Sequence, residues 1–146
     1  MAFTLKQTKS KQPLFTGSKI EEIQIPYVKP TGLRNDLFDQ LDALMQSKDY
    51  DDEFHAPTGS AFSRMRGFLD GASSHLGTEL PLGTMYADGD GGLRLEWIRP
   101  DRELRLVVST LPEGRSYIYH EQGNDYAADY SPTADALSSW LSWLGN

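Results

Sequence analysis

Two short runs in the second half of the chain alternate apolar with mostly charged residues. The first run occupies residues 93–98 and the second residues 104–108. An alternation of period two is typical of β-strands that bury one face and expose the other. Between the runs, residues 99–102 (Arg-Pro-Asp-Arg) have proline at the second position of a tight turn, where its fixed φ is favourable. We therefore predict a β-hairpin at the centre of the fold.

One register of this hairpin satisfies both of its faces. Closing the turn at residues 99–102 sets Glu96 opposite Arg105 on one face, an ion pair that contributes a few tenths to about 1 kcal/mol. The other face then carries three apolar pairs: Leu93 with Val108, Leu95 with Leu106, and Trp97 with Leu104. Because a slip of one residue would expose these apolar side chains, we expect the register to be strongly specified.

Further strands are expected on both sides of the hairpin. Residues 84–86 favour a strand before the glycine-rich turn of residues 88–92, and residues 116–120 and 126–130 favour two more strands afterwards. The turn at residues 111–115 leaves two arrangements open. With a three-residue loop, Val108 pairs with Ile118 while Tyr117 and Tyr119 share the face of Arg105 and Val107. With a two-residue loop, the two tyrosines lie on the opposite face.

Helical periodicity precedes and follows the strands. One helix is predicted from Leu33 to about Ser47, with Asn35 or Thr31 as its N-cap, and a second begins at Pro57-Thr58. A third is expected to start at Ser131-Pro132 and to stop at Gly145. Glycines at 67, 71 and 77 weaken or end the second helix. The apolar stripes, which are typical of core-facing sides, comprise Leu33, Leu37, Leu41, Leu44 and Met45, then Ala61, Phe62, Met65, Phe68, Leu69, Ala72 and Leu76, and finally Leu137, Trp140, Leu141 and Leu144.

These elements predict an α+β fold with one antiparallel meander sheet of four to five strands, two preceding helices and a C-terminal helix, the helices covering one face. The domain is expected to span residues 33–146. Residues 1–32 are expected to form a flexible basic arm and an extended strap, in which Pro26 disfavours a central strand. The strap residues Ile23, Ile25 and Tyr27 are candidates to contact a partner's sheet or groove, or to lie over the chain's own domain.

The net charge of −7 is distributed unevenly. Residues 1–20 hold four lysines and no acidic residue, which leaves −11 on the remainder of the chain. An acidic body favours partners with a basic surface and disfavours nucleic-acid binding. The absence of cysteine excludes disulfides and zinc–cysteine sites. No apolar run suits a membrane span or a signal peptide, so we expect a soluble cytoplasmic protein without membrane contact.

The acidic, glycine-rich turn at residues 88–92 is not expected to bind calcium. A calcium loop starting at Asp88 would need a carboxylate at position 99, which is Arg99. The turn also lacks the lysine of a phosphate loop and precedes a strand instead of a helix. The three histidines, at positions 55, 75 and 120, have no metal-ligand spacing. No metal or other cofactor is therefore predicted.

Two groups of residues are candidates for function. The first is an acidic loop that suits a basic partner, with Tyr50, Asp51, Asp52 and Glu53. The second is a sheet face of tyrosines and arginines, which are enriched at protein interfaces, and its candidates are Arg94, Arg105, Tyr117, Tyr119 and His120. An alternative interpretation adds Arg115 and Glu121 to this group as a small RNase-like site, because endoribonucleases of the toxin kind use Arg, Tyr and His on a sheet.

Three short motifs carry a resemblance to a known class of proteins. They are Tyr50-Asp51, Pro57-Thr58 and the run Asp90-Gly91-Gly92-Leu93-Arg94-Leu95-Glu96-Trp97. With them the chain resembles small uncharacterised bacterial proteins in which a helix and an aromatic-Asp loop precede a helix that begins at proline and a strand of the form DGGxxLEW. The resemblance covers about residues 33–144. It implies an association with toxin–antitoxin or defence gene pairs and assigns no catalytic residue.

The sequence thus favours a non-catalytic protein-binding module, such as an antitoxin, immunity protein or inhibitor. The alternative is a small RNase-like enzyme that uses Arg115, Tyr117, Tyr119 and His120. A third hypothesis, a small-molecule binding domain, requires a pocket between the sheet and the helices.

Overall fold

The structure is a computed structural model that describes residues 36–110 and 115–145. Five strands form one antiparallel sheet in which each strand pairs with its neighbours in the chain, so the order is β2-β3-β4-β5-β6. This arrangement confirms the predicted α+β class, with two helices before the meander and one after it. The elements are α1 (Leu37–Gln46), α2 (Gly59–Leu76), β2 (Thr84–Ala87), β3 (Leu93–Ile98), β4 (Arg102–Val108), β5 (Tyr117–Gln122), β6 (Asp125–Asp129) and α3 (Ala134–Leu144).

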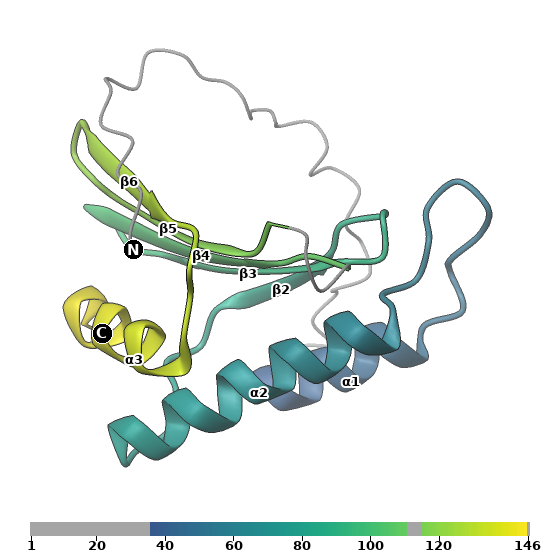
Figure 1. The fold of residues 1–146 in the computed structure, drawn as a ribbon, viewed down its shortest axis with the longest axis horizontal. Coiled ribbons are helices and arrows are strands. Elements are labelled where there is room, and N and C mark those ends of the chain that lie inside the picture. The colour runs from purple at the N-terminus through teal and green to yellow at the C-terminus, as the bar shows by residue number, and fades with distance from the viewer. Residues whose placement is uncertain (1–35, 111–114, 146) are drawn as a thin grey trace.

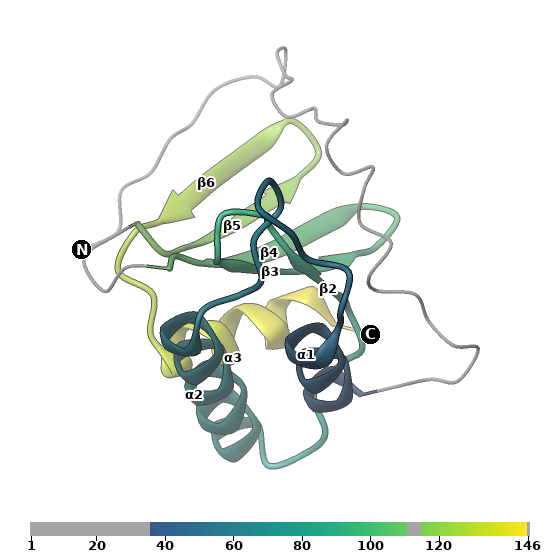
Figure 2. The ribbon, with the colours of Figure 1, turned by 90° about the vertical axis from the view of Figure 1, so that its right-hand side faces the viewer.

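The molecule has two layers. All three helices lie on the same side of the sheet, with α1 and α2 next to each other and α3 running beneath the strands (Figures 1 and 2). Among the described residues, no helix covers the other side. The sheet twists strongly from β2 to β6, as Figure 2 shows. Such a twist is normal, because each strand twists about its own axis and neighbouring strands rotate relative to one another.

The core lies between these layers, because every second strand residue points at the helices. Leu95 and Leu106 come from the central strands and are fully buried, as is Met65 from α2. Trp97 is also fully buried, and its indole N–H donates to the carbonyl oxygen of Pro81 at 2.9 Å. The core therefore consists of the predicted apolar stripes of the helices and the inward residues of the hairpin. A few predicted positions, such as Met45 and Phe62, are only half-buried, and Leu33 lies outside the described residues.

The central hairpin has the predicted register. Leu93 pairs with Val108, Leu95 with Leu106, Trp97 with Leu104 and Glu96 with Arg105. Arg99 and Arg102 close the turn with two backbone hydrogen bonds, of 2.8 and 3.4 Å. The second strand starts two residues earlier than the alternation indicated, because the turn itself needs only the residues Pro100 and Asp101.

The helix starts differ from prediction. Asp36, and not Asn35 or Thr31, is the N-cap of α1, and its carboxylate accepts the backbone N–H of Asp39 at 2.8 Å. Thr133, and not Ser131, caps α3 by accepting the N–H of Ala136. Asp, Asn, Thr and Ser all cap helices well, so the sequence alone does not determine which of these residues becomes the N-cap. The predicted start of α2 at Pro57-Thr58 is confirmed, with Thr58 as the N-cap, and of the three glycines it is Gly77 that ends the helix, in the left-handed conformation.

The fourth strand resolves the alternative that the sequence left open. Tyr117 and Tyr119 share the face of Arg105 and Val107, as the longer loop predicted, but Ile118 pairs with Leu106 and not with Val108. The shift is two residues, and an even shift keeps each side chain on its face. The loop residues 111–114, including the expected Gly114, lie outside the described residues. The following hairpin turns at Gly123 and Asn124, between the two predicted strands, and the turn is shorter than predicted because β5 continues to Gln122 and β6 begins at Asp125.

Candidate functional site

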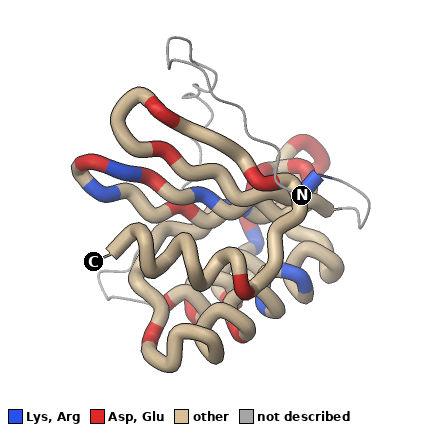
Figure 3. Tube along the Cα trace, turned by 60° about the vertical axis from the view of Figure 1, so that its left-hand side comes forward, with Lys and Arg blue, Asp and Glu red and all other residues tan. Residues whose placement is uncertain are grey.

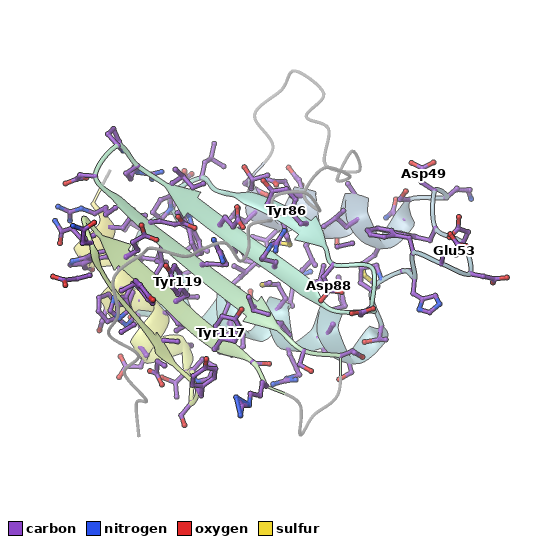
Figure 4. All side chains as sticks on the ribbon, turned by 90° about the horizontal axis from the view of Figure 1, so that it is seen from above. Asp49, Glu53, Tyr86, Asp88, Tyr117 and Tyr119 are labelled. Atoms are coloured by element: carbon purple, nitrogen blue, oxygen red, sulfur yellow. The ribbon has the colours of Figure 1, made fainter. Side chains whose placement is uncertain are left out.

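The helix-free side of the sheet, called the open face here, presents its side chains in three rows that run across the strands. Figure 4 looks down onto this face, with Tyr86, Tyr117 and Tyr119 labelled on it. The first row is Tyr86, Arg94, Val107 and Tyr117; the second is Thr84, Glu96, Arg105, Tyr119 and Ala128; and the third is Ile98, Glu103, Glu121 and Tyr126. Three strands, β3, β4 and β5, thus bring the sequence-predicted residues Arg94, Arg105, Tyr117 and Tyr119 into one surface.

A network of ion pairs occupies the centre of the open face. Glu96 Oε2 lies 3.2 Å from Nε of Arg94 and 3.3 Å from Nε of Arg105. Arg105 also donates through Nη2 to Glu103. Only 13% of the Glu96 side chain is exposed. Because these charges are partly buried and each constrains the next, the network holds its side chains in a fixed geometry.

Arginine–tyrosine contacts extend this network toward both edges of the sheet. The guanidinium carbon of Arg94 lies 5.2 Å from the ring centre of Tyr86, and that of Arg105 lies 5.0 Å from the ring of Tyr119. At the far edge, Arg115 lies 5.0 Å from the ring of Tyr130. These are cation–π distances, and each adds to the stiffness of the face.

Burial shifts the ionisation of several groups on the open face. Desolvation raises the pKa of Glu96, and the attraction of Arg105 and Arg94 opposes this shift only in part. Desolvation is also the largest cause that raises the pKa of Tyr117 and of Tyr119. The hydrogen bond from the Tyr119 hydroxyl to Glu121 Oε1, at 2.7 Å, adds to the shift of Tyr119. Both phenols therefore remain neutral hydrogen-bond donors at physiological pH.

His120 does not belong to this surface, contrary to prediction. Strand alternation turns it toward the helices, opposite Leu104 and Ala127, while Tyr119 next to it points the other way. Its imidazole stacks on Trp140 with ring centres 3.7 Å apart. Desolvation lowers the pKa of His120. The predicted Arg-Tyr-His cluster is thus divided between the two faces of the sheet.

The predicted acidic loop is a separate, well-braced element. The Tyr50 hydroxyl donates to the carbonyl oxygen of Leu44 at 2.7 Å, and its ring stacks on Phe54. Asp51 Oδ1 accepts the N–H groups of Phe54 and Glu53, and these bonds lower the pKa of Asp51. Asp52 and Glu53 are exposed, and Figure 4 shows Glu53 beyond the end of the sheet. The loop and the open face are therefore two distinct surfaces.

The glycine-rich turn at residues 88–92 anchors the acidic loop. The N–H of His55 donates to the carbonyl oxygen of Gly89, and that of Thr58 to Gly91, both at 2.9 Å. Asp88 Oδ1 accepts the N–H groups of Asp90 at 2.8 Å and Gly92 at 3.0 Å. The residues that carry the resemblance, from the aromatic-Asp loop to the DGG turn, thus meet in space and have structural roles. The sequence did not reveal this contact, because it joins segments more than thirty residues apart.

The predicted strap residues Ile23, Ile25 and Tyr27 lie outside the residues that the structure describes. Within residues 36–110 and 115–145, no three His, Asp or Glu side chains gather as a metal site would require. Over the same residues, none of the helices combines the length and apolarity needed to cross a membrane.

The charged positions lie mainly on the strands, loops and first two helices (Figure 3). In contrast, α3 carries a single charged residue, Asp135.

Comparison with protein-family models, with curated proteins and with solved structures finds no match for this chain.

Proposed function

We propose that the chain is a non-catalytic protein-binding module of the antitoxin, immunity or inhibitor kind, acting in the cytoplasm within a bacterial or phage defence-type system. The observation that carries the proposal is the open face itself, a surface of tyrosines, arginines and glutamates that no described helix covers. The link to defence systems rests on the sequence resemblance alone.

The composition and stiffness of the open face support protein binding. Tyrosine and arginine are enriched among the residues that dominate interface energies. Here Arg94 and Arg105 are already held by Glu96 and by tyrosine rings, so a partner need not order them. Side chains that are fixed before binding lose less conformational entropy on association, which strengthens the complex.

The acidic loop supports a partner with a basic surface. Asp52 and Glu53 are exposed on a segment whose backbone is braced by Asp51 and by the Tyr50–Phe54 stack. A rigid acidic projection accelerates the encounter with a positively charged partner through long-range attraction. We therefore assign steering to the loop and docking to the open face.

Site-specific photocrosslinking in the source organism tests this proposal. A photoreactive amino acid at Tyr119 should capture one partner in stoichiometric amounts, because Tyr119 lies in the second row of the open face. The matched control places the same group at Asp42, which is exposed on α1 on the helical side. No adduct at Tyr119, or the same adducts at both positions, would contradict docking on this face.

A small RNase-like enzyme remains the second candidate, and Arg94, Arg105, Tyr117 and Tyr119 on one face are what favours it. Such an enzyme would have to work without His120 beside the tyrosines. It predicts RNA cleavage by the purified chain that Tyr119→Phe abolishes and His120→Phe preserves. The protein-binding proposal predicts no cleavage by the wild-type chain.

A further inference from the structure

Four tyrosines of β5 and β6 surround a small side chain, Ala128, on the open face. Ala128 lies opposite Tyr119, and Tyr126 and Tyr130 flank it along the edge strand β6. The ring centres of Tyr119 and Tyr126 are 5.9 Å apart, and those of Tyr117 and Tyr130 are 5.4 Å apart. Ala128 is only 5% exposed, although no described helix lies over it. These five residues form an aromatic surface, called the tyrosine patch here.

Opposite charges lie at the two ends of the tyrosine patch. At one end, the exposed Arg115 has its guanidinium carbon 5.0 Å from the ring centre of Tyr130. At the other end, the carboxylate of Glu121 accepts the hydroxyl of Tyr119. Glu121 follows Arg115 by six residues, which corresponds to about 20 Å along a strand. A complementary extended segment would thus carry an acidic residue, then apolar residues, then a basic residue.

The chain itself contains such a segment before its first described residue. Residues 21–29, called the strap segment here, read Glu-Glu-Ile-Gln-Ile-Pro-Tyr-Val-Lys. In an extended backbone every second side chain points the same way, so one side of the segment carries both charged ends and the apolar positions between them. These positions are Glu21, Ile23, Ile25, Tyr27 and Lys29. The segment spans about 26 Å, and the long side chains at its ends cover the difference from about 20 Å.

The place where the described chain begins lets the strap segment reach the patch. Asp36 lines a surface hollow together with Leu82, which lies two residues before β2. From β2 to β5 there are three strand spacings, or about 14 Å, and the layer of helices lies roughly 10 Å below the sheet. The seven residues from Lys29 to Asp36 span about 23 Å when extended. Because the tether is this short, it also gives the segment a high effective concentration at the open face.

The nearest edge of the sheet does not compete for the segment. The side-chain amide of Gln40 donates to the carbonyl oxygen of Gly83 at 3.0 Å, and its oxygen accepts the N–H of Met85 at 2.9 Å. Helix α1 thereby covers the backbone groups through which β2 would add another strand. The segment is therefore directed over the open face and not along the edge of β2.

We propose that the strap segment of this chain lies along β5 and β6 on the open face. Glu21 pairs with Arg115, Lys29 pairs with Glu121, and the apolar side chains between them pack on the tyrosine patch. The segment then shields part of the docking face, so a partner has to displace it and the strap is autoinhibitory. This shielding role rests on the proposed function, whereas the contact itself does not.

Crosslinking between introduced cysteines tests the contact in the full-length chain, which has no cysteine of its own. A thiol crosslinker of about 10 Å, the spacing of layers packed on a sheet, should link Ile25→Cys to Ala128→Cys. The control pair joins Ile25→Cys to Asp42→Cys, which is exposed on the helical side. The control should link about tenfold more slowly, although loop closure to Asp42 is the easier of the two. Tyr27→Cys with Tyr126→Cys provides a second pair on the patch.

Two outcomes of the crosslinking would overturn the proposal. Equal rates at the patch and at Asp42 would show that the strap segment has no preferred place. A rate that rises with protein concentration would show that a second copy of the chain, and not the chain's own segment, occupies the patch.

Charge reversal tests the orientation of the segment. Glu21→Lys puts a cation beside Arg115 and should slow the linkage of Ile25→Cys to Ala128→Cys about twofold to fivefold. Adding Arg115→Glu should restore the rate. The matched control Glu22→Lys changes the net charge equally, but on the opposite side of an extended segment, and should leave the rate unchanged. Equal slowing by both lysine variants, or no restoration, would refute this orientation.

Partner capture at Tyr119 tests the shielding role and separates the two proposals. Ile25→Asp places a charge in the apolar contact and should raise the yield of the partner adduct about twofold or more. An unchanged or lower yield would overturn autoinhibition. Linkage to the patch without any captured partner keeps the strap contact and refutes the protein-binding role. A captured partner without linkage refutes the strap contact and keeps the docking face.

Discussion

Glu96 and Arg105 face each other across β3 and β4, and Nε of Arg105 lies 3.3 Å from Oε2 of Glu96. Arg94 approaches the same oxygen at 3.2 Å. Desolvation nevertheless raises the pKa of Glu96, so burial disfavours its charge more than the two arginines favour it. The pair therefore defines the geometry of the open face at some expense in stability, as partly buried ion pairs commonly do.

Replacing Glu96 by glutamine should reveal the cost of burying this charge, as a pH-dependent difference in stability from wild type. A carboxyl group whose pKa is raised by folding stabilises the native state below its ordinary pKa and loses this contribution as pH rises through the raised value. The free energy of unfolding of Glu96→Gln, relative to wild type, should therefore increase across that range. Urea denaturation between about pH 4 and pH 7 measures the difference.

The companion variant Arg105→Gln, in contrast, should lower the free energy of unfolding. It leaves Glu96 and Glu103 partly buried with one cation fewer, which should cost about 3 kcal/mol at neutral pH. A parallel pH profile for wild type and Glu96→Gln, or a neutral effect of Arg105→Gln, would refute the account of the network.

Gly71 in α2 is predicted to be required for the contact with α3. A Cβ atom at this position would lie 2.4 Å from Cβ of Ala134, so Gly71→Ala should destabilise the protein by about 1–3 kcal/mol despite its better helix propensity. Gly67 in the same helix has nothing within 4 Å of such an atom, and Gly67→Ala should stabilise by about 0.5–1 kcal/mol. Thermal or urea unfolding of the two variants should give shifts of opposite sign.

His120 should titrate below the ordinary histidine value. Desolvation is the largest cause of its lowered pKa, and the stacked ring of Trp140 contributes to that burial. Since the unfolded chain takes up this proton first, the contribution of His120 to stability is lost as pH falls through the ordinary value. An NMR titration should show the low pKa in wild type and a higher one in Trp140→Leu, where water reaches the imidazole. A pKa that is unchanged by Trp140→Leu would show that the indole does not shield the ring.

Asp88 is predicted to be a turn residue and not a metal ligand. Its Oδ1 accepts two backbone N–H groups, so Asp88→Ala should cost about 1–3 kcal/mol. Asp90 is exposed, and Asp90→Ala should change stability by less than about 0.5 kcal/mol. Addition of calcium should leave the thermal midpoint of the wild-type protein unchanged. A midpoint that rises with calcium, and equal losses in the two variants, would point to a metal site.

The sequence alone determined those parts of the fold that depend on short-range patterns. Alternation over residues 93–98 and 104–108, with the Arg-Pro-Asp-Arg turn between them, specified a hairpin in which Glu96 meets Arg105, and the structure has this register. The helical stripes and the start of the second helix at Pro57-Thr58 were equally local, because a helix buries one side and needs a hydrogen-bond acceptor at its start. Two of the open-face candidates, Arg94 and Arg105, followed from the strand alternation, whereas the face of Tyr117 and Tyr119 stayed open.

Only the tertiary structure decided the rest, because each remaining feature depends on segments that are distant in the chain. The face of His120 depends on the connection that sets the register of β5 against β4, and the sequence left that connection open. The acidic loop is braced by the turn at residues 88–92, a contact that no local pattern contains. The opposition of Glu103 and Glu121 across β4 and β5 also arises only when both strands are in register.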